Sequence, residues 1–104
     1  MRALVYLTSA RADLADILRY IAGESGRVTV AQTFADNLMK RCERLASLPG
    51  KLGTPRPELR PDIRSTPYQS YVIFFSYEGE RVEIVNILAA ARDIDAHYGA
   101  ETGA

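Results

Sequence analysis

The stretch from Tyr71 to Leu88 constrains the fold more than any other part of the sequence. Two segments rich in β-branched and aromatic residues, 71–77 and 81–88, flank a short turn that contains Gly79. This pattern predicts a β-hairpin. Apolar side chains alternate onto both faces of its first strand, with Tyr71, Ile73, Phe75 and Tyr77 on one face and Val72 and Phe74 on the other. Both faces therefore need cover, and a chain this short can supply helices for one of them.

The size and charge of the chain exclude several classes of protein. A chain of 104 residues indicates one domain, which can bury about 60–70% of the surface exposed by its unfolded form. Thirteen Lys and Arg balance thirteen Asp and Glu, so no global charge points to nucleic acid or to an anionic membrane. No apolar run approaches the roughly 20 residues that cross a bilayer. A single cysteine and the lack of a secretory signal pattern lead us to expect a cytoplasmic protein.

The remaining segments predict two helices and two further strands. An apolar run at 2–7 predicts a strand, and Thr8-Ser9 suits a helix N-cap. Apolar residues recur three or four positions apart over 10–22 and again over 27–48, which predicts two amphipathic helices joined as a hairpin. A proline-rich extended linker at 51–67 becomes a strand at 63–66. We therefore expect an α+β fold, β-α-α-β-β-β, with a small antiparallel sheet, an α-helical hairpin on one face and a short C-terminal helix. Residues 1–98 are expected to form a single domain, followed by a frayed tail at 99–104.

Few residues carry an obvious chemical motif. The sequence has no phosphate-binding loop, dinucleotide fingerprint, paired-histidine metal motif or nucleophile elbow, so we expect no metal and no other cofactor. Cys42 lies on the apolar stripe of the second helix, where a buried hydrophobic role is favoured over a catalytic thiol. His97 is interpreted as an exposed side chain near the end of the chain, the alternative being a general acid or base in RNA cleavage.

Three arginines and a tyrosine permit two interpretations: Arg60, Arg64, Arg92 and Tyr98. Arginine matches phosphate geometry and tyrosine can stack on a base, so this set could bind a nucleic-acid backbone or an acidic protein groove. Internal ion pairs are the alternative, joining Arg92 to Asp93 or Asp95 and Arg64 to Asp62 or Glu83. The sequence leaves both interpretations open.

Several short segments occur in a characteristic order along nearly the whole chain. They are Ala12-Asp13-Leu14, residues 17–21, residues 45–49 with the gap to Gly53, Pro57-Glu58-Leu59-Arg60, Ile63-Arg64-Ser65, residues 71–75, Val82-Glu83-Ile84-Val85 and Ala91-Arg92-Asp93. No segment is specific by itself. In this order and spacing, they resemble the ParE branch of the RelE/ParE family of toxins.

The resemblance implies the toxin of a type II toxin-antitoxin module, made with a small antitoxin of the ParD kind. In such antitoxins the N-terminal part resembles ribbon-helix-helix DNA-binding proteins, so operator DNA is contacted only indirectly, through the antitoxin. The C-terminal segment wraps the toxin, and we expect it to cover the apolar sheet face that the helices leave free. The candidate antitoxin-binding residues are Tyr71, Ile73, Phe74, Phe75 and Tyr77. Which of the two faces the antitoxin takes stays open.

The resemblance also implies a target inside the cell. ParE-type toxins are associated with DNA gyrase, whereas RelE-type relatives cut mRNA on the ribosome. Arg64, Arg92 and Tyr98 match positions of the RelE-type site, and Arg60 matches one residue of a preceding basic pair. Asp62 occupies the other position, where a carboxylate would repel a scissile phosphate. We therefore expect no catalytic residues and a binding toxin that inhibits DNA gyrase, with these three arginines and the tyrosine as candidate target-binding residues. A ribosome-dependent mRNA endonuclease and an inactive toxin that acts as a co-repressor partner are the alternatives.

Overall fold

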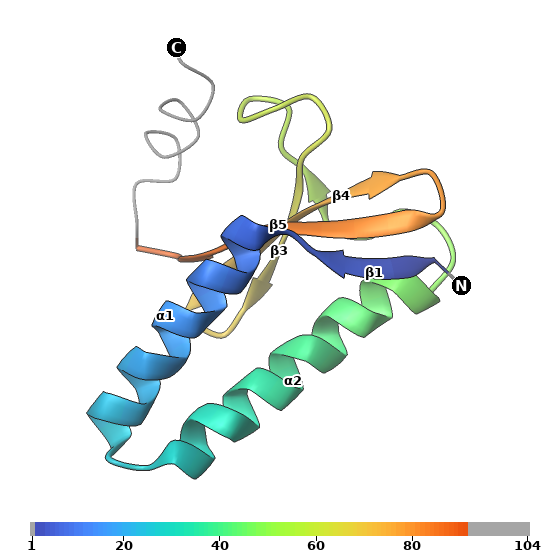
Figure 1. The fold of residues 1–104 in the computed structure, drawn as a ribbon. Coiled ribbons are helices and arrows are strands. Elements are labelled where there is room, and N and C mark those ends of the chain that lie inside the picture. Colours follow the sequence, from blue (N-terminus) through green and yellow to red (C-terminus); the bar gives the residue numbers. More distant parts are fainter. Residues whose placement is uncertain (1, 92–104) are drawn as a thin grey trace.

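The structure, a computed structural model, describes residues 2–91 of the chain (Figure 1). Its elements follow in the order β1 (Ala3–Tyr6), α1 (Thr8–Ser25), α2 (Val28–Ser47), β2 (Thr54–Pro55), β3 (Arg64–Tyr68), β4 (Tyr71–Glu78) and β5 (Arg81–Ala89). The predicted α+β class and the order of the main elements are confirmed. The predicted C-terminal helix and the tail at 99–104 lie outside the described residues.

The strands form one mixed sheet with the order β1-β5-β4-β3-β2. The pairs β2–β3, β3–β4 and β4–β5 are antiparallel, as expected. The edge strand β1 instead pairs parallel with β5, with Leu4 opposite Val82. An apolar run specifies a strand, whereas its direction depends on the route of the chain through the two helices. The prediction of a purely antiparallel sheet was therefore wrong at this edge.

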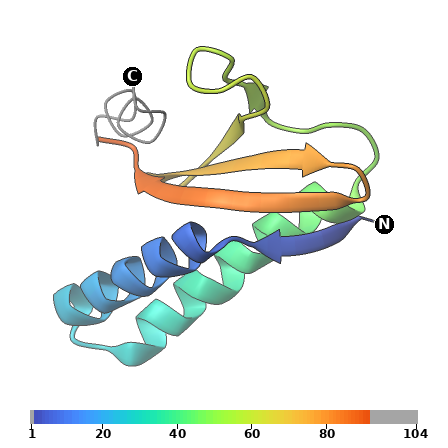
Figure 2. The same ribbon diagram turned by 45° about the horizontal axis from the view of Figure 1, so that its top comes forward.

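The two helices form a layer on one face of the sheet (Figure 2). Helix α1 continues through Gly23 and ends at Gly26, whose left-handed φ of 70° terminates the helix while its N–H donates to the Ala22 carbonyl. The expected hydroxyl cap at the start of α1 does not form. The Ser9 hydroxyl instead donates to the Val85 carbonyl on β5 at 2.6 Å. None of the helices in the described part of the chain is long and apolar enough to cross a membrane.

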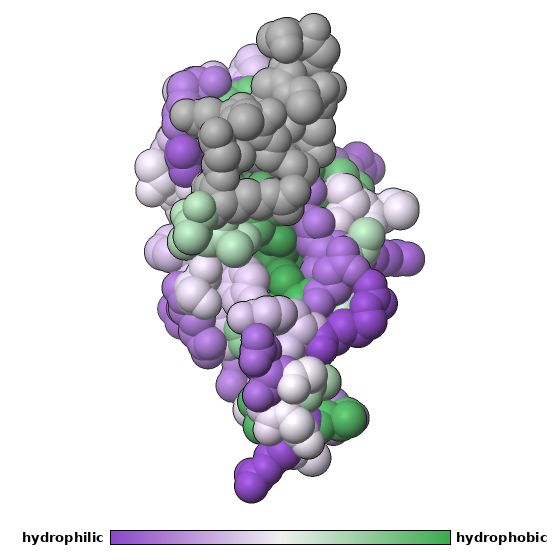
Figure 3. Space-filling model, turned by 90° about the vertical axis from the view of Figure 1, so that its left-hand side faces the viewer, coloured by the Kyte–Doolittle hydropathy of each residue, from purple (hydrophilic) through white to green (hydrophobic). Residues whose placement is uncertain are grey.

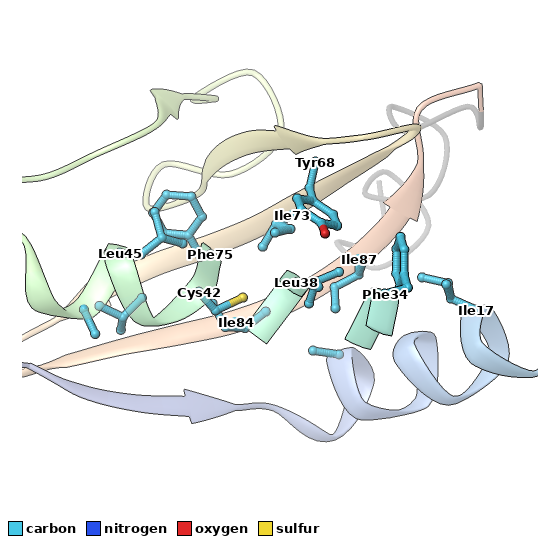
Figure 4. Close-up of a cluster of buried hydrophobic side chains, with 13 residues drawn as sticks. Ile17, Phe34, Leu38, Cys42, Leu45, Tyr68, Ile73, Phe75, Ile84 and Ile87 are labelled. Carbon is cyan, nitrogen blue, oxygen red and sulfur yellow. The ribbon is translucent and has the colours of Figure 1, made fainter. Parts of the chain in front are cut away.

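The main core fills the space between the helices and the sheet (Figure 4). Helix α2 supplies Phe34, Leu38, Cys42 and Leu45, and the sheet supplies Ile73, Phe75, Ile84 and Ile87. The apolar stripe expected on the second helix is thus confirmed as a core surface.

A second core covers the opposite face of the sheet. Leu59 and Ile63, from the proline-rich segment after β2, pack with Phe74, Val85 and Leu88. The chain therefore covers the centre of this face by itself, and the prediction that the face is left free was wrong. The prolines identify this segment as extended. Its packing over the sheet is a contact between distant parts of the chain, which a local pattern does not predict.

Candidate partner-binding groove

An apolar groove lies where the helical hairpin meets one end of the sheet. It consists of two adjoining pockets of about 600 and 530 Å³, which share Tyr20, Ser70 and Tyr71. The first pocket lies between α1 and the end of β5, and the second between the hairpin and the turn that joins β3 to β4. Figure 3 shows this end of the molecule, where hydrophobic residues form a strip in the hollow between hydrophilic flanks.

Aromatic side chains form the middle wall of this groove. The Tyr71 ring makes an edge-to-face contact with Phe34 at 5.5 Å, and Phe34 makes the same kind of contact with Tyr68. Tyr20 stands on α1 with 61% of its surface exposed. Burial raises the pKa of the Tyr71 hydroxyl, and the neighbouring Tyr20 adds to this effect, so the hydroxyl stays a neutral donor. The wall thus offers a large apolar surface with two polar groups, the hydroxyls of Tyr20 and Tyr71.

The turn between β3 and β4 shapes the floor of the groove. Gln69 has a φ of 54°, which is uncommon for a residue other than glycine and costs about 1–3 kcal/mol. The Ser70 carbonyl accepts a hydrogen bond from Ala90 N–H at 2.9 Å and so ties the end of β5 to the turn. Strained backbone often accompanies a functional surface, and both Gln69 and Ser70 line the groove.

A polar clasp holds α1 against β5 beside the first pocket. Val85 is an extra residue in β5, because Phe74 pairs with Asn86 and Phe75 with Ile84. Next to this bulge, Asp13 Oδ2 accepts hydrogen bonds from Asn86 Nδ2 at 3.0 Å and from Ile87 N–H at 2.9 Å. Asp13 itself lines the pocket. The clasp therefore fixes the wall that the last residues of β5 contribute.

The candidate antitoxin-binding residues do not lie on one accessible surface. Ile73, Phe74 and Phe75 are 0% exposed, so their side chains belong to the two cores. Tyr71 lines the groove. Tyr77 is engaged internally, since its hydroxyl donates to Leu45 O and accepts from Leu52 N–H. Among these five candidates, Tyr71 is the one in the groove.

Tyr20 and Val30 also line the groove, although no motif or periodic pattern in the sequence singles them out. Both lie outside the regular apolar stripes of their helices. Their signal in the sequence is large apolar side chains at positions where the stripe predicts polar ones.

Two of the candidate target-binding residues are placed by the structure, and both have internal partners. Arg64 donates to the carbonyls of Leu52 at 2.7 Å, Gly53 at 3.2 Å and Lys51 at 3.4 Å. Arg60 Nε lies 3.6 Å from the carboxylate of Asp62. Arg64 is thus bound within the chain as one interpretation expected, but to backbone carbonyls in place of the suggested Asp62 or Glu83. Arg92, Tyr98 and His97 lie outside the described residues.

The described residues hold no group of three or more side chains suited to a metal ion. Cys42 is fully buried, and burial raises the pKa of its thiol to about 11. The thiol therefore stays protonated near neutral pH and is a poor nucleophile. Its polar neighbour is the Tyr6 hydroxyl, whose pKa burial also raises. Within residues 2–91, no nitrogen or oxygen atom forms a hydrogen bond with this hydroxyl.

Comparison with known proteins gives a family match and a structural match. The family model described as "ParE toxin of type II toxin-antitoxin system, parDE" matches residues 4–94. A solved structure described as "Chromosomal ParDE TA system from P. aeruginosa" superposes with a TM-score of 0.74 at 20% identity, covering 86% of this chain and 96% of the other. At this identity the likeness is one of fold. The comparison with curated proteins gives no match.

Proposed function

Because this chain belongs to the family of ParE toxins of type II toxin-antitoxin systems, we propose that a ParD-like antitoxin neutralises it and that its target is DNA gyrase. It acts in this proposal by binding, without catalytic residues of its own. The antitoxin carries the DNA-binding part of the complex, so operator DNA is reached only through the antitoxin.

The groove is the observation that carries the antitoxin part of the proposal. Its two pockets form a continuous apolar surface that includes the exposed ring of Tyr20 and the side chain of Val30. Exposed apolar surface of this kind is typical of interaction sites. A partner segment can bury apolar side chains in each pocket and place polar groups at the Tyr71 hydroxyl and at Ser70. We therefore assign the C-terminal segment of the antitoxin to this groove.

Two substitutions in the groove test the antitoxin assignment. Tyr20→Asp and Val30→Asp each place a charge on an apolar wall, while both side chains are already exposed enough to spare the core. Each is expected to weaken antitoxin binding at least about tenfold, which corresponds to about 1.4 kcal/mol. Titration calorimetry with the antitoxin made with this toxin measures the change. Met39→Asp is the matched control, since Met39 is an exposed apolar residue of α2 that does not line the groove. Unchanged affinity in both groove variants would refute the assignment.

The internal partners of Arg60 and Arg64 support a binding toxin over a nuclease. General acid-base cleavage of RNA needs cations that are free to hold the phosphate. Three carbonyls hold the guanidinium of Arg64, and Asp62 places a carboxylate beside Arg60. A phosphate at this position would meet a negative charge next to the arginines.

One pair of assays separates the proposed target from the alternatives. The purified toxin is added to a gyrase supercoiling reaction and, in parallel, to translating ribosomes. We expect loss of supercoiling and intact mRNA. Codon-specific mRNA cuts without an effect on gyrase would establish the endonuclease, and no effect in either assay would favour an inactive toxin that serves as a co-repressor partner.

A further inference from the structure

The two helices carry a second apolar surface, on the side of the hairpin away from the groove. A recess of about 340 Å³ there is lined by the apolar side chains Leu18, Ala22, Val28, Ala31 and Ala35. All its lining residues belong to α1 or α2, whereas both parts of the groove include residues of the sheet or its turns. This outer recess therefore faces away from the sheet, on the free side of the helical layer seen in Figure 2.

The shape of the outer recess suits the close approach of another helix. Two of its apolar residues, Ala22 and Ala35, are small and half-buried, so a neighbour can approach the helix backbones there. Val28 at the start of α2 is 65% exposed, more than any other large hydrophobic residue of the described chain. A second copy of the chain carries the same exposed valine beside the same recess. Val28 of each copy can therefore pack against the recess of the other.

The charges at the rim of the outer recess are arranged for a two-fold contact. Arg19 lies on the α1 side and Asp36 on the α2 side. Arg19 is six residues before the end of α1 and Asp36 eight residues after the start of α2, so in an antiparallel hairpin their heights differ by only about 3 Å. A two-fold axis parallel to the helices places α1 of one copy over α2 of the other. Arg19 of each copy then faces Asp36 of the second copy.

We propose that the outer face of the helical hairpin, centred on the outer recess, is the contact surface of a homodimer of this toxin. The helical layer is roughly 30 Å long and 20 Å wide, comparable with the area of about 800 Å² per partner of a standard interface. The contact does not depend on the antitoxin, because the groove lies on the other side of the helices. In the dimer both grooves stay open, one on each outer flank.

Charge exchange across the proposed axis tests the dimer. Arg19→Glu places two carboxylates opposite each other on both sides of the axis, and Asp36→Arg does the same with two cations. Both side chains are exposed, and Arg19 forms an ion pair with the exposed Asp16, so circular dichroism should show a retained fold. Each single variant is expected to raise the dimer dissociation constant about tenfold or more. The double variant Arg19→Glu with Asp36→Arg restores the opposite charges and should return the constant to near that of the unchanged protein.

Sedimentation velocity over a wide concentration range measures the association. Val28→Asp, which places a charge in the contact, should leave only monomer, whereas Tyr20→Asp in the groove should leave the dimer intact. A toxin that is monomeric at all concentrations would overturn the proposal. So would a dimer that is unaffected by the single charge reversals, or one that the double variant fails to restore. Loss of antitoxin binding in Val28→Asp with a monomeric parent protein would assign the outer recess to the antitoxin instead.

Discussion

Removing the carboxylate of Asp13 should destabilise the protein more than any other single change on the surface of α1. Asp13→Ala deletes the acceptor shared by Asn86 Nδ2 and Ile87 N–H. Both donor residues are 2% exposed, so their N–H groups lie away from bulk water. A hydrogen bond to a charged group contributes about 1.5–3 kcal/mol, and a buried donor left without this acceptor adds a desolvation cost. We expect the free energy of unfolding to fall by about 3 kcal/mol.

The expected loss is large compared with the stability of a small domain, which is about 5–15 kcal/mol. For about 100 residues, a loss of about 3 kcal/mol lowers Tm by roughly 12–24 °C. Urea unfolding followed by far-ultraviolet circular dichroism measures it, since the chain has no tryptophan. Asp13→Asn keeps an oxygen acceptor and should cost less than half as much.

Asp16→Ala is the matched control for the clasp. Asp16 lies three residues further along α1 and forms an ion pair with the exposed Arg19. An exposed ion pair of this kind is worth at most about 1 kcal/mol. If Asp13→Ala destabilises the protein no more than Asp16→Ala does, the clasp does not hold α1 to β5 and the reasoning is refuted.

Two further predictions concern backbone conformation and titration. Gly53→Ala should lower the free energy of unfolding by about 3 kcal/mol, because φ is 74° and the new methyl group would lie 2.7 Å from both Phe75 Cζ and the Ser65 carbonyl. Gly50 has a similar φ but open space around it, so Gly50→Ala should cost only about 1 kcal/mol. Equal losses of stability in urea unfolding would contradict this account. The pKa of the Cys42 thiol is raised from 9.0 to about 11, so the folded state holds this proton more tightly and its stabilising effect is present below pH 9 and lost as pH rises toward 11. The free energy of unfolding should therefore fall between pH 9 and pH 11. It should fall less in Cys42→Ala, where the raised pKa of Tyr6 accounts for the pH dependence that is left. A thiol reagent that modifies the native protein rapidly at pH 8 would contradict the burial of Cys42.

Local patterns in the sequence predicted the elements that depend on neighbours in the chain. The alternation at 71–77 and the Gly79 turn located the β4–β5 hairpin almost to the residue. The spacing of three and four placed Phe34, Leu38 and Cys42 in the core. The end of α1 was predicted too early, because Gly23 was read as a helix end although Gly26 adopts the left-handed conformation.

Contacts between distant parts of the chain were not predictable in this way. Leu59 and Ile63 belong to a proline-rich segment that gives no periodic signal, so their packing on Phe74 was missed. Strict alternation would place Ile84 and Ile87 on opposite faces, but the bulge at Val85 brings both into the main core. The partners of Arg64 are backbone carbonyls, which have no sequence signature. Of the residues that line the groove, Tyr71 was the one named from the sequence as a binding residue. The walls of the groove come from elements that meet only in the folded protein.

The parallel pairing of β1 with β5 has a consequence for how the protein forms during synthesis. Leu4 is made 78 residues before its partner Val82. Asp13 likewise accepts its hydrogen bonds only after Asn86 and Ile87 have been made. Contacts between such distant residues form slowly, because a long loop must close first. A ribosome-bound intermediate can therefore hold the helical hairpin, but it lacks the β1–β5 pairing and the β5 wall of the groove until β5 has been made.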